Sequence, residues 1–289
     1  SEAGMDLSLE KTLETLSFSK STQALPFTVF KATSLGAFAL FEKKSKGAIL
    51  NSEEIAAWER MLKRVRTCCD LAKKLNVRML IDAEESWVQD AIDEMAENMM
   101  EMYNQNEAII FTTVQMYRKD RLPYIKELIQ KGENKNFKIG IKLVRGAYIE
   151  KENDRADEIG MPSPICESKE STDQNFDAAL DYILPRLERS NLFIGSHSES
   201  SILKTTQWMK ENKLQNDHHS IWFSQLYGMA DHISFNLASK GYQVVKYVPY
   251  GPVKDVIPYL IRRAEENTSV SGQTPRELKL IKEELQRRR

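Results

Sequence analysis

Four polar residues near the C-terminal end of the chain could bind a carboxylate. In the segment GPVKDVIPYLIRRAEEN (251–267), a turn precedes residues whose apolar spacing predicts a helix. At about 100° per residue, the side opposite the apolar stripe carries Tyr259, Arg262, Arg263 and Glu266. Guanidinium groups fork onto carboxylate oxygens in a way that lysine cannot, so this face suits an anionic ligand. A solvated face in which Glu266 pairs with Arg262 explains the same spacing equally well.

A second segment, KIGIKLVRGAYIEKE (138–152), predicts a strand that runs into a glycine turn. Gly146 would let the backbone approach a ligand, while Lys142 and Arg145 supply charge for an anionic group. The glycine spacing matches neither a dinucleotide-binding fingerprint nor a phosphate-binding loop. Taken alone, the segment is more simply a strand–helix turn with an incidental basic pair.

Two further polar residues follow apolar strands. Asp82 ends the strand of LIDAEES and needs a partner if buried, which Lys31 or an arginine could provide. His197, in IGSHSES, stands beside Ser196 at another strand end. A structural ion pair and a structural histidine are the competing interpretations. No arrangement of serine, histidine, cysteine and carboxylate indicates nucleophilic catalysis or a metal site, so we expect no metal.

Short β-branched runs alternate with amphipathic stretches, which is typical of parallel βα units. The predicted helices cover residues 54–75, 87–103, 123–131, 172–189, 199–213 and 230–240. The predicted strands cover residues 27–32, 77–82, 108–114, 138–144, 192–196, 220–224 and 243–248.

The ends of these strands favour a barrel over a doubly wound sheet. Each strand ends in or near a polar residue, in the order Lys31, Asp82, Gln115, Arg145, His197, Gln225 and Tyr247. In a barrel all such ends converge on one mouth, whereas a doubly wound sheet uses mainly those at its switch point.

Composition restricts the class of protein further. The 289 residues suffice for one barrel, and 41 basic against 42 acidic residues do not suggest a nucleic-acid partner. Three cysteines cannot form a disulfide framework. No apolar run is long enough to span a bilayer, and we recognise neither a signal peptide nor a transit sequence.

Taken together, six segments resemble the proline dehydrogenase family. In this sequence they are KLVRGAY (142–148), IDAEES (81–86), TTVQMYRKD (112–120), GSHSES (195–200), QLYGMADH (225–232) and YVPYGPVKDVIPYLIRRAEEN (247–267). Their order and spacing match the family from about Pro26 to the C-terminus. The last segment is the most specific.

The resemblance implies an α/β fold, a distorted (βα)8 TIM-like barrel that binds FAD at its mouth, with the final helix over the active site. Residues 1–289 would form this single catalytic domain, with an N-terminal loop and helix (1–25) and a C-terminal tail helix (268–289). The family's first strand would lie upstream of Ser1. Where this chain has KLVRG, most bacterial relatives have RLVKG, so the flavin contacts are expected to differ in detail.

The resemblance also implies a reaction, the first step of proline catabolism. L-proline would be oxidised to Δ¹-pyrroline-5-carboxylate, hydride would pass to flavin N5, and the electrons would go on to a membrane quinone. The expected location is the cytoplasmic face of a bacterial inner membrane, or the matrix side of the mitochondrial inner membrane. The basic amphipathic tail (276–289) could touch the membrane surface, although an exposed terminal helix is an equally good interpretation.

The family's functional positions can be carried over residue by residue. Arg262 and Arg263 would bind the substrate carboxylate, Glu266 would brace them, and Glu2 would close over Arg262 from a loop. Lys31, Asp82, Tyr148 and Lys142 would be the catalytic residues of the substrate pocket, which Tyr259, Tyr247 and Leu226 would also line. The flavin would contact Gln115, Lys142, Val144, Arg145, Gly146, Ala147, Ser196 and His197.

Three alternatives remain open from the sequence. The proline-selective branch has tyrosine at the position of Tyr247, where relatives that prefer hydroxyproline have serine, so proline is the expected substrate and hydroxyproline the first alternative. A cofactor-free barrel lyase could use Lys31 or Lys142 as a Schiff base. A non-catalytic protein could use the arginine helix to bind an acidic partner. The sequence predicts no oligomeric state.

Overall fold

A computed structural model describes residues 1–22, 24–249, 251, 253–254, 256–257, 260–261 and 282–288. The chain divides into two compact units, residues 1–245 and 246–289. The first unit contains most of the described secondary structure. No helix in the described part of the chain is long and apolar enough to cross a membrane.

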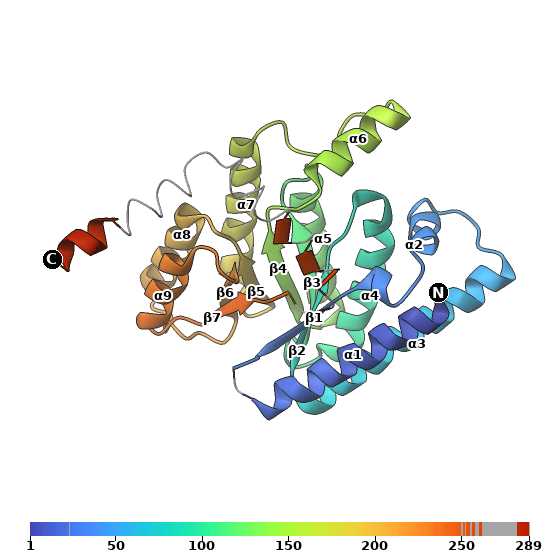
Figure 1. Ribbon diagram of the computed structural model, residues 1–289, viewed down its shortest axis with the longest axis horizontal. Coiled ribbons are helices and arrows are strands. Elements are labelled where there is room, and N and C mark those ends of the chain that lie inside the picture. The colour runs from blue at the N-terminus through green and yellow to red at the C-terminus, as the bar shows by residue number, and fades with distance from the viewer. Residues whose placement is uncertain are drawn as a thin grey trace. The chain divides into compact units, whose positions relative to one another are not determined.

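The described residues form one sheet whose seven strands follow one another in sequence order (Figure 1). The strands are β1 (Phe27–Lys31), β2 (Arg78–Asp82), β3 (Ile110–Gln115), β4 (Ile139–Val144), β5 (Ser190–Gly195), β6 (Ile221–Leu226) and β7 (Val244–Tyr247). The pairs from β1 to β6 are parallel. A doubly wound sheet reverses its strand order at a switch point, so the sequential order confirms the predicted barrel-type α/β fold.

Nine α-helices lie between Glu2 and Ser239. They are α1 (Glu2–Ser21), α2 (Phe38–Ser45), α3 (Ser52–Leu75), α4 (Ser86–Tyr103), α5 (Arg121–Lys135), α6 (Ile149–Ile159), α7 (Lys169–Ile183), α8 (Glu199–Glu211) and α9 (Asp231–Ser239). Short 3₁₀ turns occur at η1 (Ala32–Ser34) and η2 (Leu184–Arg186). The predicted strands and six of these helices are confirmed, whereas α2 and α6 were not predicted. The expected N-terminal loop is wrong, because α1 begins at Glu2.

Local sequence explains where the longest helix begins and ends. Asn51 accepts a hydrogen bond from the backbone N–H of Glu54, and the Glu54 carboxylate accepts one from the backbone of Asn51. This capping box satisfies backbone donors that no helical turn can reach. At the other end Asn76 takes the left-handed conformation (φ 53°), which terminates α3. Cys68 and Cys69 are buried within the helix, as the sequence indicates.

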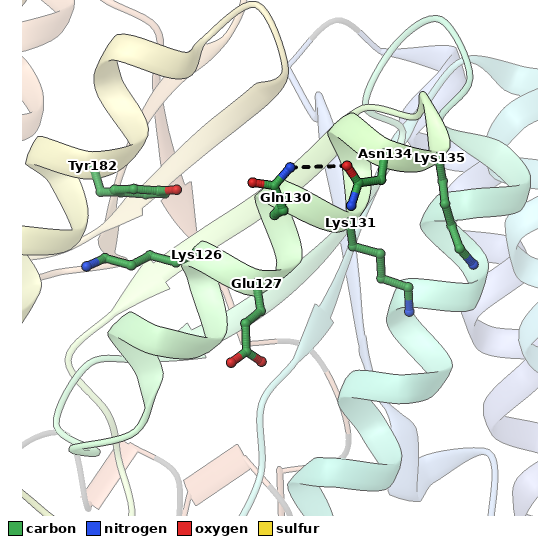
Figure 2. Close-up of a pocket in the computed structure, with 7 residues that line it drawn as sticks. All are labelled: Lys126, Glu127, Gln130, Lys131, Asn134, Lys135 and Tyr182. Carbon is green, nitrogen blue, oxygen red and sulfur yellow. Dashed lines mark hydrogen bonds between the residues drawn. The ribbon is translucent and has the colours of Figure 1, made fainter.

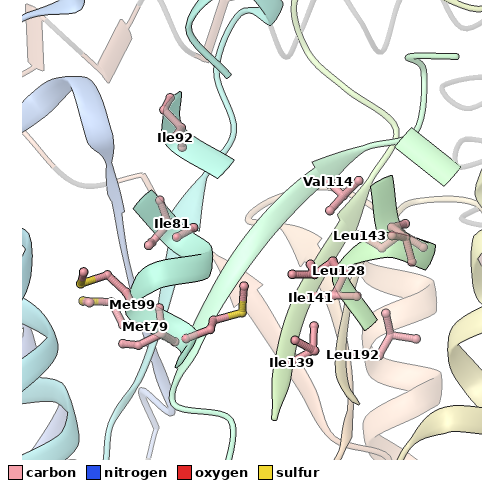
Figure 3. Close-up of a cluster of buried hydrophobic side chains, with 14 of the residues drawn as sticks. Met79, Ile81, Ile92, Met99, Val114, Leu128, Ile139, Ile141, Leu143 and Leu192 are labelled. Atoms are coloured by element: carbon pink, nitrogen blue, oxygen red, sulfur yellow. The ribbon is translucent and has the colours of Figure 1, made fainter. Parts of the chain in front are cut away.

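Buried side chains lie on both faces of the sheet, because successive strand residues point to opposite sides. The larger cluster packs against the helices and includes Met79, Ile81, Val114 and Leu143 (Figure 3). A smaller cluster on the other face contains Leu80, Phe111, Phe193 and Trp222. The Phe27 ring packs edge-on against the last three, with ring centroids 4.9 to 5.6 Å apart. This aromatic cluster supports the polar residues at the strand ends.

Candidate active site

The face that carries the aromatic cluster becomes polar toward the carboxyl ends of the strands. Two residues beyond Leu80 comes Asp82, and two beyond Phe111 comes Thr113. By the same two-residue alternation, Lys31 and Lys142 belong to this face. Three of the four predicted catalytic residues therefore come from three different strands, β1, β2 and β4, at one end of the sheet. Active sites of barrel enzymes lie at this end.

Asp82 and Lys142 form an ion pair across the intervening strand β3. The Nζ atom of Lys142 donates to Oδ1 of Asp82 at 2.5 Å, and Thr113 donates to the same oxygen at 3.4 Å. The two charged side chains are only 9% and 14% exposed. The predicted partner of Asp82 was Lys31 or an arginine, and the structure corrects this to Lys142. Lys31 lies opposite Asp82 in the register of β1 and β2, but its ammonium group contacts Tyr148 instead.

Lys31 donates to the hydroxyl of Tyr148 at 2.5 Å and lies over the tyrosine ring, 5.2 Å from its centroid. Burial lowers the pKa of the Lys31 ammonium, but Tyr148 and the carboxylates of Glu84 and Asp82 outweigh it, so the pKa is raised overall. Burial raises the pKa of Tyr148, although Lys31 opposes the change. Lys31 is therefore a charged hydrogen-bond donor at neutral pH.

Glu84 is a buried carboxylate of this site that was not predicted from the sequence. It is 4% exposed and accepts hydrogen bonds from the Thr33 backbone at 3.0 Å and hydroxyl at 2.5 Å. Burial raises the pKa of Glu84, while the two bonds from Thr33 oppose the shift. The sequence signal that could have identified Glu84 is its position two residues after Asp82 in LIDAEES. Glu84 ties the segment after β2 to the turn after β1.

Gln115 connects β3 to the glycine turn after β4. Its amide nitrogen donates to the backbone oxygen of Glu84 at 2.8 Å, and its amide oxygen accepts from the backbone of Ala147 at 3.3 Å. Gly146 lies in this turn at φ 137°, which only glycine adopts readily. A Cβ atom at Gly146 would lie 2.4 Å from the Tyr117 ring. The turn therefore rests directly on a buried aromatic ring.

Arg145 and Ser196 lie on the helix side of the sheet. The Arg145 guanidinium donates to Asp173 at 2.6 Å, to Ser196 at 2.7 Å and to Ser201 at 3.1 Å, and it stacks on Phe176. Asp173, Phe176 and Ser201 come from α7 and α8. The structure thus separates Arg145 from Lys142, which the sequence presented as one basic pair.

His197, Gln225 and Leu226 connect β5 to β6. The Nε2 atom of His197 accepts from the backbone N–H of Leu226 at 3.1 Å. Gln225 donates to the backbone oxygen of Ser196 at 3.1 Å and accepts from Ser234 at 2.8 Å. Val144 ends β4 and is half-buried. These contacts fix the predicted flavin-contacting residues of β5 and the segment after it relative to β6.

The remaining predicted site residues lie elsewhere or outside the described residues. Glu2 lies in the first turn of α1, where its carboxylate pairs with Arg60 at 2.7 Å and also with Arg64 of α3. Hydrogen bonds from Arg60 and Arg64 lower its pKa to about 2. Tyr247 ends β7. Tyr259, Arg262, Arg263 and Glu266 are outside the described residues, so their roles and the closure of Glu2 over Arg262 stay predictions.

An open cavity of about 480 Å³ lies away from these residues, against α5 and α7 (Figure 2). Its lining comprises Lys126, Glu127, Gln130, Lys131, Asn134, Lys135 and Tyr182. Lys131 and Lys135 pair with Glu97 and Glu101, both at 2.7 Å. None of the predicted site residues lines this cavity.

Comparison with known proteins decides the family. Residues 2–276 match the model of the family described as proline dehydrogenase. The chain belongs to the proline dehydrogenase family. The sequence resemblance to this family of oxidoreductases is therefore confirmed.

Individual relatives differ in how much of their length this chain covers. It is 36% identical over 99% of its length to the carbapenem antibiotics biosynthesis protein CarD of Pectobacterium carotovorum, covering 74% of that protein. It is 39% identical to mitochondrial proline dehydrogenase 1 of Homo sapiens and 35% identical to hydroxyproline dehydrogenase of Xenopus laevis. These matches cover 82% and 85% of this chain but only 40% and 54% of the two relatives.

Solved structures share the fold. Proline utilization A of Bdellovibrio bacteriovorus, inactivated by N-propargylglycine, superposes with a TM-score of 0.80 at 20% sequence identity. The match covers 94% of this chain and 29% of that protein. The corresponding protein of Corynebacterium freiburgense gives a TM-score of 0.75 at 23% identity. The shared fold is that of the barrel expected from the sequence.

Proposed function

We propose that this chain oxidises L-proline to Δ¹-pyrroline-5-carboxylate with FAD as the hydride acceptor. The observation that carries the proposal is the convergence of Lys31, Asp82, Lys142 and Tyr148 at the carboxyl ends of the strands. These four residues, which the family resemblance predicts to be catalytic, come from different parts of the sequence and form two hydrogen-bonded pairs. The family match supplies the reaction class.

The residues at the strand ends fit a flavin dinucleotide by their donor chemistry. Lys142 supplies a buried cation, Gln115 a fixed amide, and His197 a ring nitrogen, from the ends of β4, β3 and β5. On the helix side of the sheet, Arg145 and Ser196 add a guanidinium and a hydroxyl. FAD carries phosphate groups and a ring with polar edges, and both bind to cations and hydrogen-bond donors of this kind. FAD, when bound, supplies the acceptor for the hydride that leaves the carbon next to the proline nitrogen.

The chain's own residues would orient proline and control its amine proton. Hydride leaves that carbon best when the nitrogen lone pair is free, so the amine must lose its proton. Lys31 carries its own proton and is therefore a donor. The Asp82 carboxylate, held by Lys142 and Thr113, is the proposed group that attracts the amine proton. Arg262 and Arg263 are the proposed carboxylate ligands.

The barrel-lyase alternative is disfavoured by the lysines themselves. A Schiff-base lysine must be neutral to attack a carbonyl, and such lysines have lowered pKa values. The pKa of Lys31 is raised, and Lys142 is ion-paired with Asp82. Borohydride trapping of a carbonyl substrate on either lysine would support the lyase instead.

Hydroxyproline oxidation is a second candidate, because the relative from Xenopus laevis carries that name. The residue that favours proline is Tyr247, whose phenol would crowd an added ring hydroxyl. Turnover of L-proline and trans-4-hydroxyproline by the FAD-loaded protein, measured with an artificial electron acceptor, decides between the two. A clear preference for hydroxyproline would overturn the proline assignment.

The proposed electron acceptor is a membrane quinone reached by peripheral contact of the chain with the membrane. Several relatives are named as mitochondrial, and one is named for carbapenem biosynthesis. The inner face of a bacterial or mitochondrial inner membrane is the location that quinone reduction requires. We propose proline catabolism as the role, and co-sedimentation with vesicles, with and without residues 276–289, tests the membrane contact.

A further inference from the structure

Helix α6 begins immediately after one of the proposed active-site residues. Tyr148 is the residue that precedes the first turn, and its backbone oxygen accepts from the backbone of Glu152 at 2.9 Å. Its hydroxyl accepts from Lys31 at 2.5 Å. Because Tyr148 is joined to the helix in this way, the position of α6 sets the position of the phenol that Lys31 contacts.

One turn into α6, Glu152 is almost completely buried. It is 1% exposed, and its two carboxylate oxygens accept hydrogen bonds from the backbone N–H and the hydroxyl of Ser86, both at 2.6 Å. Within the described part of the chain, Glu152 forms no salt bridge. A buried carboxylate without a cation is costly unless other groups satisfy it. Ser86 is therefore the main group that holds it.

Ser86 is the first residue of α4, which begins without a side-chain cap. The preceding residue, Glu85, makes no capping hydrogen bond, and the first turn of α4 has no acidic residue. A helix N-terminus presents unpaired N–H groups and a partial positive charge. Glu152 supplies the missing cap from a helix that lies 66 residues further along the chain. The cap thus joins α4 to α6.

Tyr117 lies beneath the same segment. Its buried ring supports Gly146. The pKa of the Tyr117 hydroxyl is raised, mainly by burial and next by the nearby Glu152 carboxylate. The turn from Arg145 to Tyr148 is thus supported by a rigid ring below and by the Glu152 cap at its far end. Two ion pairs also hold α6, Lys151 with Glu85 before α4 and Arg155 with Glu42 of α2, and each contains a side chain much more exposed than Glu152.

We infer that Glu152 is a positioning residue, which acts through Tyr148 by clamping the start of α6 to the N-terminus of α4. This inference rests on the proposed proline oxidation, because Tyr148 is a substrate-pocket residue only in that reaction. Glu152 contacts Ser86 and not the reacting atoms, so its effect on turnover must pass through the residue that α6 carries. Glu152 is not among the residues to which the family resemblance gives a role, and no sequence motif assigns it one.

The test combines Glu152→Gln with Tyr148→Phe. Glutamine keeps the size of the side chain but loses the charge and presents an N–H group toward the donors of Ser86. We expect kcat/KM for proline to fall about tenfold or more, with normal flavin content. In the Tyr148→Phe background the same change is expected to cost less than about twofold, because the group it positions is gone. Equal losses in both backgrounds, or no loss, would overturn the inference.

Three further variants separate positioning from general damage to the fold. Ser86→Ala is expected to lower kcat/KM and Ser86→Thr, which retains the hydroxyl, to restore it. Arg155→Met serves as the matched control, since it removes a partly buried ion pair at 2.6 Å between the same helix and α2, and should leave kcat/KM unchanged. A loss in Arg155→Met as large as that in Glu152→Gln would count against a specific role for Glu152.

If the wild-type protein did not oxidise proline, the proposed function would be refuted but the positioning role of Glu152 would not. A measurement that does not depend on activity tests that role. The ionisation of Tyr148 is followed by tyrosinate absorbance as the difference between the wild-type protein and Tyr148→Phe. In Glu152→Gln the pKa of Tyr148 should move toward its ordinary value as the ring becomes more exposed. An unchanged titration would overturn the inference whatever the substrate.

Discussion

Asp82 and Lys142 lie on strands that are not neighbours, and yet their charged atoms are 2.5 Å apart. Strand β3 runs between them and contributes Thr113, which donates to the same carboxylate oxygen. The three residues share one face of the sheet because each occupies the same phase of the strand alternation. This arrangement gives the site a largely buried, oriented carboxylate that is paired with the Lys142 ammonium.

Asp82→Asn should damage both stability and turnover. It removes the carboxylate from beside the buried Lys142 ammonium, which is expected to cost about 3 kcal/mol of unfolding free energy. Loss of the group that attracts the amine proton should lower kcat/KM for proline by about 100-fold. Urea unfolding and steady-state kinetics measure the two effects.

The control for this change is Asp181→Asn. Asp181 pairs with Lys204 at 2.8 Å and is 62% exposed, so its loss should cost less than about 0.5 kcal/mol and leave turnover unchanged. If the two variants were equally stable and equally active, the Asp82–Lys142 pair would have no special role.

Gly146→Ala should be much more destabilising than Gly160→Ala. Both glycines have positive φ, at 137° and 63°, but only at Gly146 would the added Cβ meet the Tyr117 ring, whereas nothing lies within 4 Å at Gly160. We expect a cost of about 3 kcal/mol at Gly146 and about 1 kcal/mol at Gly160. Thermal unfolding of the two variants gives the comparison, and equal costs would show that the turn does not rest on the ring.

Glu2 should make the stability of the protein depend on acid pH. Hydrogen bonds from Arg60 and Arg64 lower its pKa from 4.5 to about 2, so the folded state favours the charged form. The stabilisation is complete above the ordinary pKa and is lost as the pH falls from about 4.5 to about 2. Because the carboxylate is 48% exposed, the effect at neutral pH is expected to be no more than about 1 kcal/mol.

Urea unfolding of the wild-type protein and Glu2→Gln at several pH values measures this dependence. The difference between them should shrink as the pH approaches 2. Glu14→Gln, which breaks the exposed pair with Lys11 on the same helix, should show a smaller difference at neutral pH. A difference for Glu2→Gln that does not change with pH would contradict the explanation.

Arg262→Met and Arg263→Met should weaken proline binding without displacing the flavin. Each removes a guanidinium from the face of the predicted helix that carries Tyr259, Arg262 and Arg263. We expect the KM for proline to rise about 100-fold, since a charge-assisted bond to a carboxylate contributes about 2–3 kcal/mol. An unchanged KM in both variants would rule out this helix as the carboxylate site.

The central strands β3 to β6 could be predicted from sequence because nearly all of their residues are buried. In β3 every residue is buried, and the apolar and β-branched run that results is easily recognised. The polar strand ends were equally visible, since Lys31, Asp82 and Gln115 each follow such a run. Their partners could not be read in the same way, because which ammonium reaches Asp82 depends on the packing of three strands.

Helix α6 and its cap were missed for a physical reason. Its apolar ends, Ile149 and Ile159, are exposed, and its buried residues are Ala156 and the charged Glu152. No hydrophobic stripe marks such a helix. Arg145 shows a different limit of sequence analysis. The motif suggested that Arg145 and Lys142 share one role, but the two-residue alternation places Arg145 on the helix side of the sheet, away from Lys142.

The visible absorption spectrum of the purified protein under anaerobic conditions tests the central claim most directly. We predict an oxidised flavin spectrum that bleaches when L-proline is added, and much less when trans-4-hydroxyproline is added at the same concentration. A protein that binds no flavin when FAD is supplied, or a flavin spectrum that proline leaves unchanged, would contradict the proposed function.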